Sequence, residues 1–126
     1  MSMKYCLIFI IGVLISSSSH AKRKAPKPVL PIISGNYVYT VPHWSYENGT
    51  NQSGGYIQVL DTKTGNPIWG LQIYNTSYEQ SQESDVQDVF ITSTELNFWG
   101  NKLKVANELG HIYTVVLKNK AVSFVE

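Results

Sequence analysis

The sequence predicts an all-β domain, a single small antiparallel meander of about seven or eight strands that forms a sandwich or a partly open barrel. Short runs of β-branched and aromatic residues alternate with polar residues, and Gly, Asn and Asp separate the runs about every 8 to 12 residues. No window repeats apolar residues at helical spacing. These three observations together indicate strands and turns rather than helices.

The expected strands follow one another along the chain with short connections. They are 37–41, 56–61, 67–74, 86–93, 95–99, 102–107, 112–117 and 121–125. Glycines at Gly65, Gly100 and Gly110 stand between neighbouring runs, where tight hairpins need a left-handed residue. Consecutive strands are therefore expected to pair antiparallel.

Alternation within the runs predicts which side chains form the core. Trp69, Leu71 and Ile73 share one face of their run, and Leu103 and Val105 share one face of another. The residues between them, Gln72, Lys102 and Lys104, are expected to face water.

The hairpin "GGYIQVLDTKTGNPIW" carries a distinctive pattern of an apolar strand, an acidic residue, a Thr-Gly turn and an aliphatic-Trp strand. Its key residues are Val59, Leu60, Asp61, Lys63, Thr64, Gly65 and Trp69. It resembles one blade hairpin of the propellers of the quinoprotein (PQQ-dependent dehydrogenase-like) family, in which such a Trp packs between blades. A fainter echo, "GHIYTVVLKNKAVSFV", places Gly110 and Val115 where the first copy has Gly54 and Val59, without the Thr-Gly turn or the Trp.

The resemblance implies hairpin geometry and nothing of the quinone chemistry. A propeller needs at least about four blades of about 40 residues, and this chain has strands for barely two. No cofactor is therefore expected.

The first residues have the form of a secretory signal peptide. Lys4, an apolar run and a small-residue end at Ala21 predict a signal peptide over 1–21, a basic, proline-containing flexible leader over 22–32 and the β-domain over 33–126. The apolar run is too short for a stable membrane insertion. The single cysteine, Cys6, lies within the signal, so no disulfide is expected. We expect a bacterial periplasmic or secreted protein.

Charge excludes one class of partner. From Val29 onward the chain has five lysines and nine acidic residues, and the other basic residues crowd the leader. A nucleic-acid-binding domain needs a basic face, so no nucleic acid is expected. The glycosylation triplets at Asn48, Asn51 and Asn75 are interpreted as markers of loops.

No catalytic grouping stands out, so we expect a protein that is not an enzyme. His43 and His111 are isolated in the sequence without a third ligand, and no metal is expected. Glu79, Glu83, Asp85 and Asp88 form the densest acidic segment. That segment is either a solvated loop, a patch that docks a basic partner, a calcium site or a glycosidase carboxylate pair.

Aromatic residues supply the candidate contact surface. In "PHWSYENGTNQSGG", the part "PHWSY" is expected to continue the first strand, so that Trp44 either caps the core or, with His43 and Tyr46, contacts a partner. Phe90 is expected on a central strand; the alternative is an exposed strip of Phe90, Phe98 and Trp99.

Three functions follow from these residues. The leading hypothesis is a non-enzymatic exported domain that binds a protein, as an inhibitor, an immunity protein or an envelope accessory protein does. The second is a glycan-binding module that uses Trp44, Tyr46 and Trp99. The third is a small hydrolase built on Asp85, Asp88 or His111.

Overall fold

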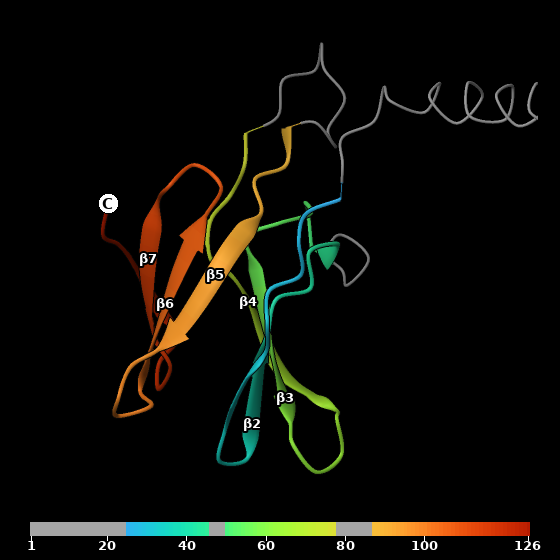
Figure 1. The fold of residues 1–126 in the computed structure, drawn as a ribbon, viewed down its shortest axis with the longest axis vertical. Helices are drawn as coiled ribbons and strands as arrows, with labels where there is room; N and C mark the ends of the chain where they lie inside the picture. Colours follow the sequence, from blue (N-terminus) through green and yellow to red (C-terminus); the bar gives the residue numbers. More distant parts are fainter. Residues whose placement is uncertain (1–24, 46–49, 78–86) are drawn as a thin grey trace, which may run out of the picture.

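The computed structural model describes residues 25–45, 50–77 and 87–126. In these residues the chain forms eight strands in two four-stranded antiparallel sheets. Sheet A contains β1 (Ile32–Ser34), β2 (Tyr37–Thr40), β3 (Tyr56–Asp61) and β4 (Pro67–Gln72), and sheet B contains β5 (Ile91–Leu96), β6 (Lys102–Asn107), β7 (Ile112–Val116) and β8 (Ala121–Phe124) (Figure 1). The all-β prediction is confirmed, and the sandwich, rather than a closed barrel, is the form it takes.

Each sheet is a meander in which strands adjacent in sequence are adjacent in space. The predicted turns explain this order. In the β3–β4 turn, Asp61 Oδ1 accepts the backbone N–H groups of Lys63 and Thr64 at 2.8 and 3.1 Å, and Gly65 takes a φ of +76°. In the β5–β6 turn, Asn97 Oδ1 accepts the N–H groups of Asn101 and Lys102, both at 3.0 Å. Such turns close the chain locally and leave each strand paired with the next.

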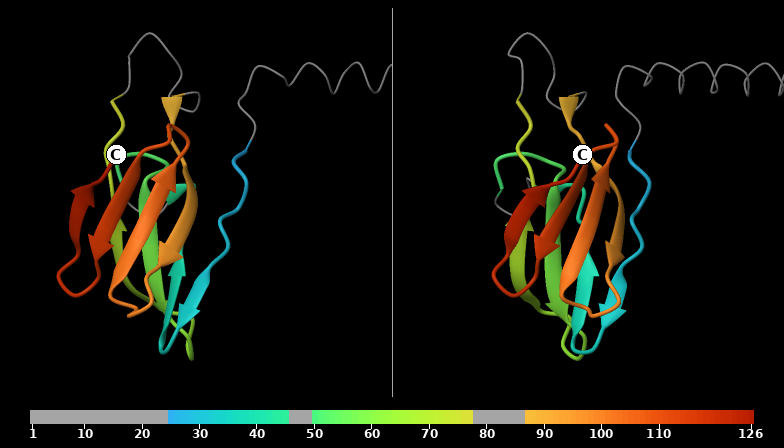
Figure 2. Two further views of the ribbon diagram at one scale, coloured as in Figure 1. Left: turned by 60° about the vertical axis from the view of Figure 1, so that its left-hand side comes forward. Right: turned by 90° about the vertical axis from the view of Figure 1, so that its left-hand side faces the viewer.

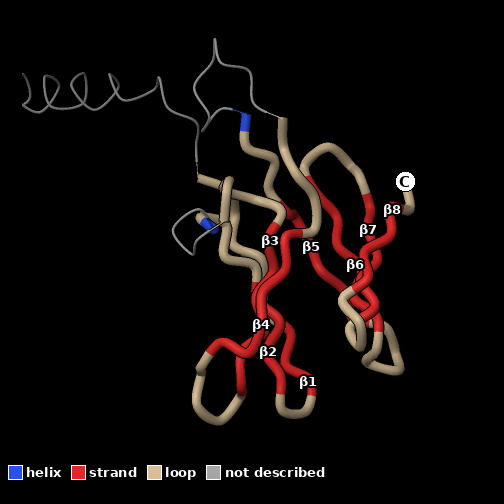
Figure 3. The backbone as a smooth tube through the Cα atoms, turned by 180° about the vertical axis from the view of Figure 1, so that it is seen from behind, coloured by secondary structure: helices blue, strands red, loops and turns tan. Residues whose placement is uncertain are grey.

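The two sheets present equivalent ends to the same side (Figures 2 and 3). The turns 35–36, 62–66, 97–101 and 117–120 lie at one end, which we call the turn end. The connections 41–55, 73–90 and 108–111, where they are described, lie at the other, which we call the loop end.

The core lies between the sheets. Its buried members are Ile57, Ile73, Ile91, Leu103, Val105 and Val115, with Trp69 and Leu71 among the partly buried residues packed on them. The predicted core faces are thereby confirmed. Lys102 and Lys104 are exposed as predicted, but Gln72 is not solvated. Its amide nitrogen is held by the carbonyl oxygens of Gly54 and Tyr74 at 3.0 and 2.9 Å.

The prediction that "PHWSY" extends the first strand is wrong. β2 ends at Thr40, before Pro42, and His43 and Trp44 lie in a turn. Proline has no backbone N–H to donate to a neighbouring strand, so the ladder ends there. The run 67–74 is also shorter than predicted, because β4 ends at Gln72.

Two further strand predictions are wrong. A single strand, β5, stands where strands at 86–93 and 95–99 were expected, and it begins only at Ile91. The segment from Asn97 to Trp99 belongs to the turn that the Asn97 side chain closes.

One strand, β1, was not predicted from the sequence. β1 pairs with β2 through the register Ile33↔Val38, across a two-residue turn in which Gly35 has a φ of +59°. Its three residues are too few to show an alternating pattern.

Candidate functional site

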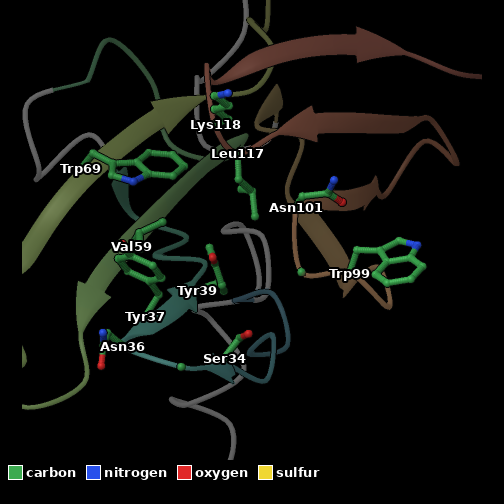
Figure 4. Close-up of a pocket in the computed structure, with 12 residues that line it drawn as sticks. Ser34, Asn36, Tyr37, Tyr39, Val59, Trp69, Trp99, Asn101, Leu117 and Lys118 are labelled. Carbon is green, nitrogen blue, oxygen red and sulfur yellow. The ribbon is translucent and has the colours of Figure 1, made fainter.

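An open groove lies between the sheets at the turn end. The sheets meet in the middle of the molecule and diverge toward this end (Figure 1), leaving a cavity of about 560 Å³. Tyr37, Tyr39 and Trp69 line it from sheet A, and Trp99 and Leu117 line it from sheet B. Figure 4 shows Trp69 and Tyr37 on one side of the groove and Trp99 on the other.

Strand register builds the wall on sheet A. Tyr39 pairs with Val59, and Val59 pairs with Trp69, so the three side chains form one row across β2, β3 and β4. Tyr39 and Val59 are buried, whereas Tyr37 is 45% exposed, and its ring centroid lies 6.4 Å from that of Tyr39. Burial, and secondarily the neighbouring Tyr37, raises the pKa of Tyr39. At neutral pH the Tyr39 hydroxyl is protonated, as in any tyrosine, and can donate a hydrogen bond.

The rim on sheet B consists of two aromatic rings that the turn holds outward. Phe98 is 91% exposed and Trp99 is 80% exposed, and their ring centroids lie 5.1 Å apart in an edge-to-face pair. Gly100, with a φ of +71°, and the side chain of Asn97 fix the turn that presents them. Large apolar rings in this state are available for contact with another molecule.

Polar groups accompany the rings. Asn36, Asn101 and Lys118 line the groove, and Lys120 Nζ lies 4.9 Å from the centroid of the Trp69 ring. The groove therefore offers amide donors and acceptors beside aromatic faces, together with two ammonium groups.

Charge is divided between the two ends. Lys63, Lys102, Lys118 and Lys120 lie at the turn end, where Asp61 is committed to its own turn. Of the described acidic residues, Asp88, Glu108 and Glu126 lie toward the loop end, where Lys27 also lies, and Glu95 lies beside Lys104 on sheet B. The groove therefore sits at the basic end of a chain whose body is acidic overall.

Two predicted site residues lie at the opposite end. The rings of His43 and Trp44 contact the buried Phe90 edge-on, at centroid distances of 5.3 and 5.4 Å. His43 Nε2 lies 2.7 Å from the carbonyl oxygen of Lys27. Trp44 is 46% exposed, so it covers Phe90 with one part of its ring and faces water with the other.

None of the other predicted site residues that the structure describes lines the groove. Tyr46, Glu79, Glu83 and Asp85 lie outside the described residues. Asp88 is buried near the loop end, and the His111 ring packs edge-on against Phe124 at 5.4 Å. Within 25–45, 50–77 and 87–126, no group of three or more His, Cys, Asp or Glu residues could hold a metal ion.

The segment that looked like a spacer contains a buried polar anchor. Gln52 is 5% exposed; its Nε2 donates to the Gly54 and Tyr74 carbonyl oxygens at 3.0 and 3.2 Å, and its Oε1 accepts the Thr76 N–H at 2.7 Å. Ser45 Oγ donates to the Gln52 carbonyl oxygen at 2.9 Å. The end of this connection is therefore fixed to the sandwich.

Sequence reasoning found one residue of the groove, Trp99, as a site residue and treated Trp69 as core only. It missed Tyr37 and Tyr39, which come from the first hairpin. Their alternation with Val38 and Thr40 is a visible signal for a shared face, but not for the divergence of the sheets that exposes it.

No protein-family model matches the chain, and no curated protein matches it in sequence. In the part of the chain that the structure describes, no helix is long and apolar enough to cross a membrane.

Proposed function

We propose that this chain is an exported, non-enzymatic β-domain that binds another protein through the groove at its turn end. The observation that carries the proposal is the strongly exposed ring of Trp99, which lines the groove together with Tyr37 and Trp69 and has the exposed ring of Phe98 packed against it. Aromatic anchors of this kind, next to a pocket, dominate the binding energy of protein interfaces.

The shape favours a polypeptide segment as the ligand. The groove is open along its length and spans both sheets, so an extended segment can enter with one apolar side chain between Trp69 and Leu117. Asn36 and Asn101, on opposite walls, can hydrogen-bond the backbone of such a segment.

Charge favours an acidic segment. Lys118 lines the groove and Lys120 lies against the Trp69 ring, and no acidic residue is among the described residues that line the groove. Complementary charge speeds the encounter and selects among partners more than it strengthens the final complex. This proposal differs from the alternative in which the acidic 79–88 segment docks a basic partner.

Two features support an exported protein without catalytic activity. The signal-like residues 1–21 motivate export. His111, which the hydrolase hypothesis would recruit, packs against Phe124, and the other described histidine, His43, contacts Lys27 and Phe90.

The test uses the expressed protein as bait in a cell-envelope extract, with Trp99→Ala and Trp44→Ala as matched variants. Each variant removes one exposed tryptophan, at the turn end or at the loop end. We expect one partner to be retained by the wild type and by Trp44→Ala, and its Kd to rise by about 30-fold in Trp99→Ala, the loss of about 2 kcal/mol typical of a hot spot. Equal retention by Trp99→Ala, or a hydrolytic activity without any partner, would refute the proposal.

A glycan is the second candidate, because aromatic faces beside amide side chains also suit sugar rings. The groove has both in Tyr37, Trp69 and Trp99 with Asn36 and Asn101. Tryptophan fluorescence titrated with peptidoglycan fragments and neutral polysaccharides distinguishes the two. A change that Trp99→Ala abolishes identifies a glycan, and an unchanged spectrum leaves the protein ligand.

A further inference from the structure

We infer that the outer face of sheet A is a self-association surface on which a second copy of this chain packs about a two-fold axis. This surface lies on the side of sheet A away from the core and is separate from the groove. It is formed by the outward residues of β1 to β4, and its central row consists of Ile33, Val38, Leu60, Pro67 and Ile68.

Register places this row across the whole sheet. Ile33 pairs with Val38, Val38 with Leu60, and Leu60 with Pro67. A register shift at Val59/Leu60 sets two residues of β4, Pro67 and Ile68, opposite Leu60. The row is thus apolar from one edge of the sheet to the other.

The row is accessible, although sheet A already has a covered core face. Ile33 is 72% exposed and Ile68 is 47% exposed, and they stand at the two edges with the half-buried Val38 and Leu60 between them. The solvated face of an antiparallel sheet usually carries polar side chains, so a continuous apolar row on it is unusual. We therefore expect another molecule to cover this row.

The occupant that fits is a second copy. The other outward residues of sheet A are Thr40, Tyr56, Gln58, Gly70 and Gln72, so no charged side chain points from this face. Two identical uncharged faces meet without repulsion, whereas a charged partner gains nothing here. A two-fold contact also requires a surface that complements itself.

The row has that self-complementarity. With a two-fold axis parallel to the strands and between β2 and β3, Ile33 of one copy lies opposite Ile68 of the other, and Val38 lies opposite Leu60. The face is also nearly flat beyond the row, because the ring of Tyr56 lies over Gly70, in the place that a Cβ would fill. Sheet-on-sheet packing of this kind already joins sheet A to sheet B.

The area of the outer face of sheet A limits the affinity of the dimer. The four strands have 3, 4, 6 and 6 residues. At about 3.3 Å per residue and about 4.8 Å between strands, they give a footprint of roughly 300 Å². This is below the roughly 800 Å² per partner of a standard interface, so the dimer is weak and depends on concentration.

The experiment is sedimentation velocity on the full chain as expressed, from about 5 µM to about 1 mM. The double variant Ile33→Lys/Ile68→Lys places a charge at each end of the row, and Ser123→Lys places one on the outer face of sheet B as a control. We expect a concentration-dependent dimer in the wild type, a rise in Kd of at least about tenfold in the double variant, and less than about a twofold change in the control. Circular dichroism checks that each variant is folded, and Ile33→Thr/Ile68→Thr replaces the lysine variant if it is not.

Raising the NaCl concentration serves as a second readout, since an uncharged contact does not weaken in salt. A monomer at every concentration overturns the inference. So does a dimer that the row variants leave intact, or a dimer that Trp99→Ala breaks, because the latter would run through the groove.

Discussion

Sheets A and B are the same four-stranded meander built twice, and they differ in their second connection and in their outer faces. Between its second and third strands, sheet A uses residues 41–55, whereas sheet B uses only 108–111. The outer face of sheet A carries the apolar row, whereas that of sheet B carries Glu95, Lys104, Thr114 and Ser123 in one register row, with Lys102 beside Val116 in the next. The same topology therefore presents a polar outer face in sheet B and an apolar row on the outer face of sheet A.

The largest expected effect is the loss of unfolding free energy when a glycine in each of these connections is replaced by alanine. Gly54 and Gly110 both have positive φ, of +88° and +81°, but only Gly54 is enclosed: an added Cβ would lie 2.5 Å from the Val89 carbonyl oxygen. Gly54→Ala is expected to lower the free energy of unfolding by about 2–5 kcal/mol, from the strained φ and the forced shift together, and Gly110→Ala by about 1–2 kcal/mol from φ alone. Urea denaturation of both variants measures the difference. Equal losses would show that the two connections are packed alike.

Removal of the buried Gln52 amide in the 41–55 connection is expected to give the next largest loss of unfolding free energy. Gln52→Ala leaves the Thr76 N–H without its acceptor, although Gln72 still donates to the Gly54 and Tyr74 carbonyl oxygens. We expect a loss of about 1–3 kcal/mol. The counterpart in sheet B is Asn107→Ala, which removes the acceptor for the Leu109 and His111 N–H groups. Asn107 is itself buried, but Leu109 is exposed and His111 half-buried, so water can replace the lost acceptor and the expected cost is smaller, about 1 kcal/mol. Thermal denaturation of Gln52→Ala and Asn107→Ala tests this ranking. A larger fall in melting temperature in Asn107→Ala would contradict it.

A pH dependence distinguishes the inner faces. Tyr39 pairs with Val59 as Leu103 pairs with Val115, so sheet A has an ionisable group where sheet B has an aliphatic one. Because the folded state raises the pKa of Tyr39 above 10.0, the unfolded chain loses this proton first, and stability is expected to fall as the pH rises above about 10. Below pH 10 the group contributes no slope. The urea midpoint is expected to fall less between pH 8 and pH 10.5 in Tyr39→Phe than in the wild type. An equal fall in the two proteins would assign the pH dependence to other groups.

The smallest effect concerns the polar row of sheet B. Lys104 Nζ lies 3.5 Å from Glu95 Oε2, and both side chains are more than half exposed. Lys104→Ala is expected to change the free energy of unfolding by no more than about 0.5 kcal/mol, because water and salt screen such a pair. Denaturation in low and high NaCl checks this, with Leu60→Thr on the outer face of sheet A as the comparison. A large, salt-sensitive loss of unfolding free energy in Lys104→Ala would show that the polar row of sheet B contributes to stability.

Tight turns and alternation were readable from the sequence because their causes are local. Asp61 and Gly65 act within a few residues of themselves, and the core faces of Trp69 and Leu103 follow from a period of two. The echo between Gly54 and Gly110 and between Val59 and Val115 also marked equivalent places, because β3 and β7 are the third strands of their sheets.

The failures have equally specific causes. Pro42 ended β2 where the aromatic pattern predicted continuation, and the Asn97 turn ended β5 before Phe98 and Trp99. Gln52 looked like spacer because its partners, Tyr74 and Thr76, lie more than 20 residues away in the chain. A side chain's burial depends on such distant partners, which composition does not show.

The sequence by itself determined that this chain is all-β, which residues face its core, and where the β3–β4 and β6–β7 turns fall, since neighbouring residues decide each of these. Only the tertiary structure decided that the meander is divided into two sheets and that these diverge to open a groove between Trp69 and Trp99. It likewise decided that an apolar row crosses one outer face from edge to edge. The physical reason is that the groove and the face are made by residues from several strands, whose pairing register and sheet packing no local pattern specifies.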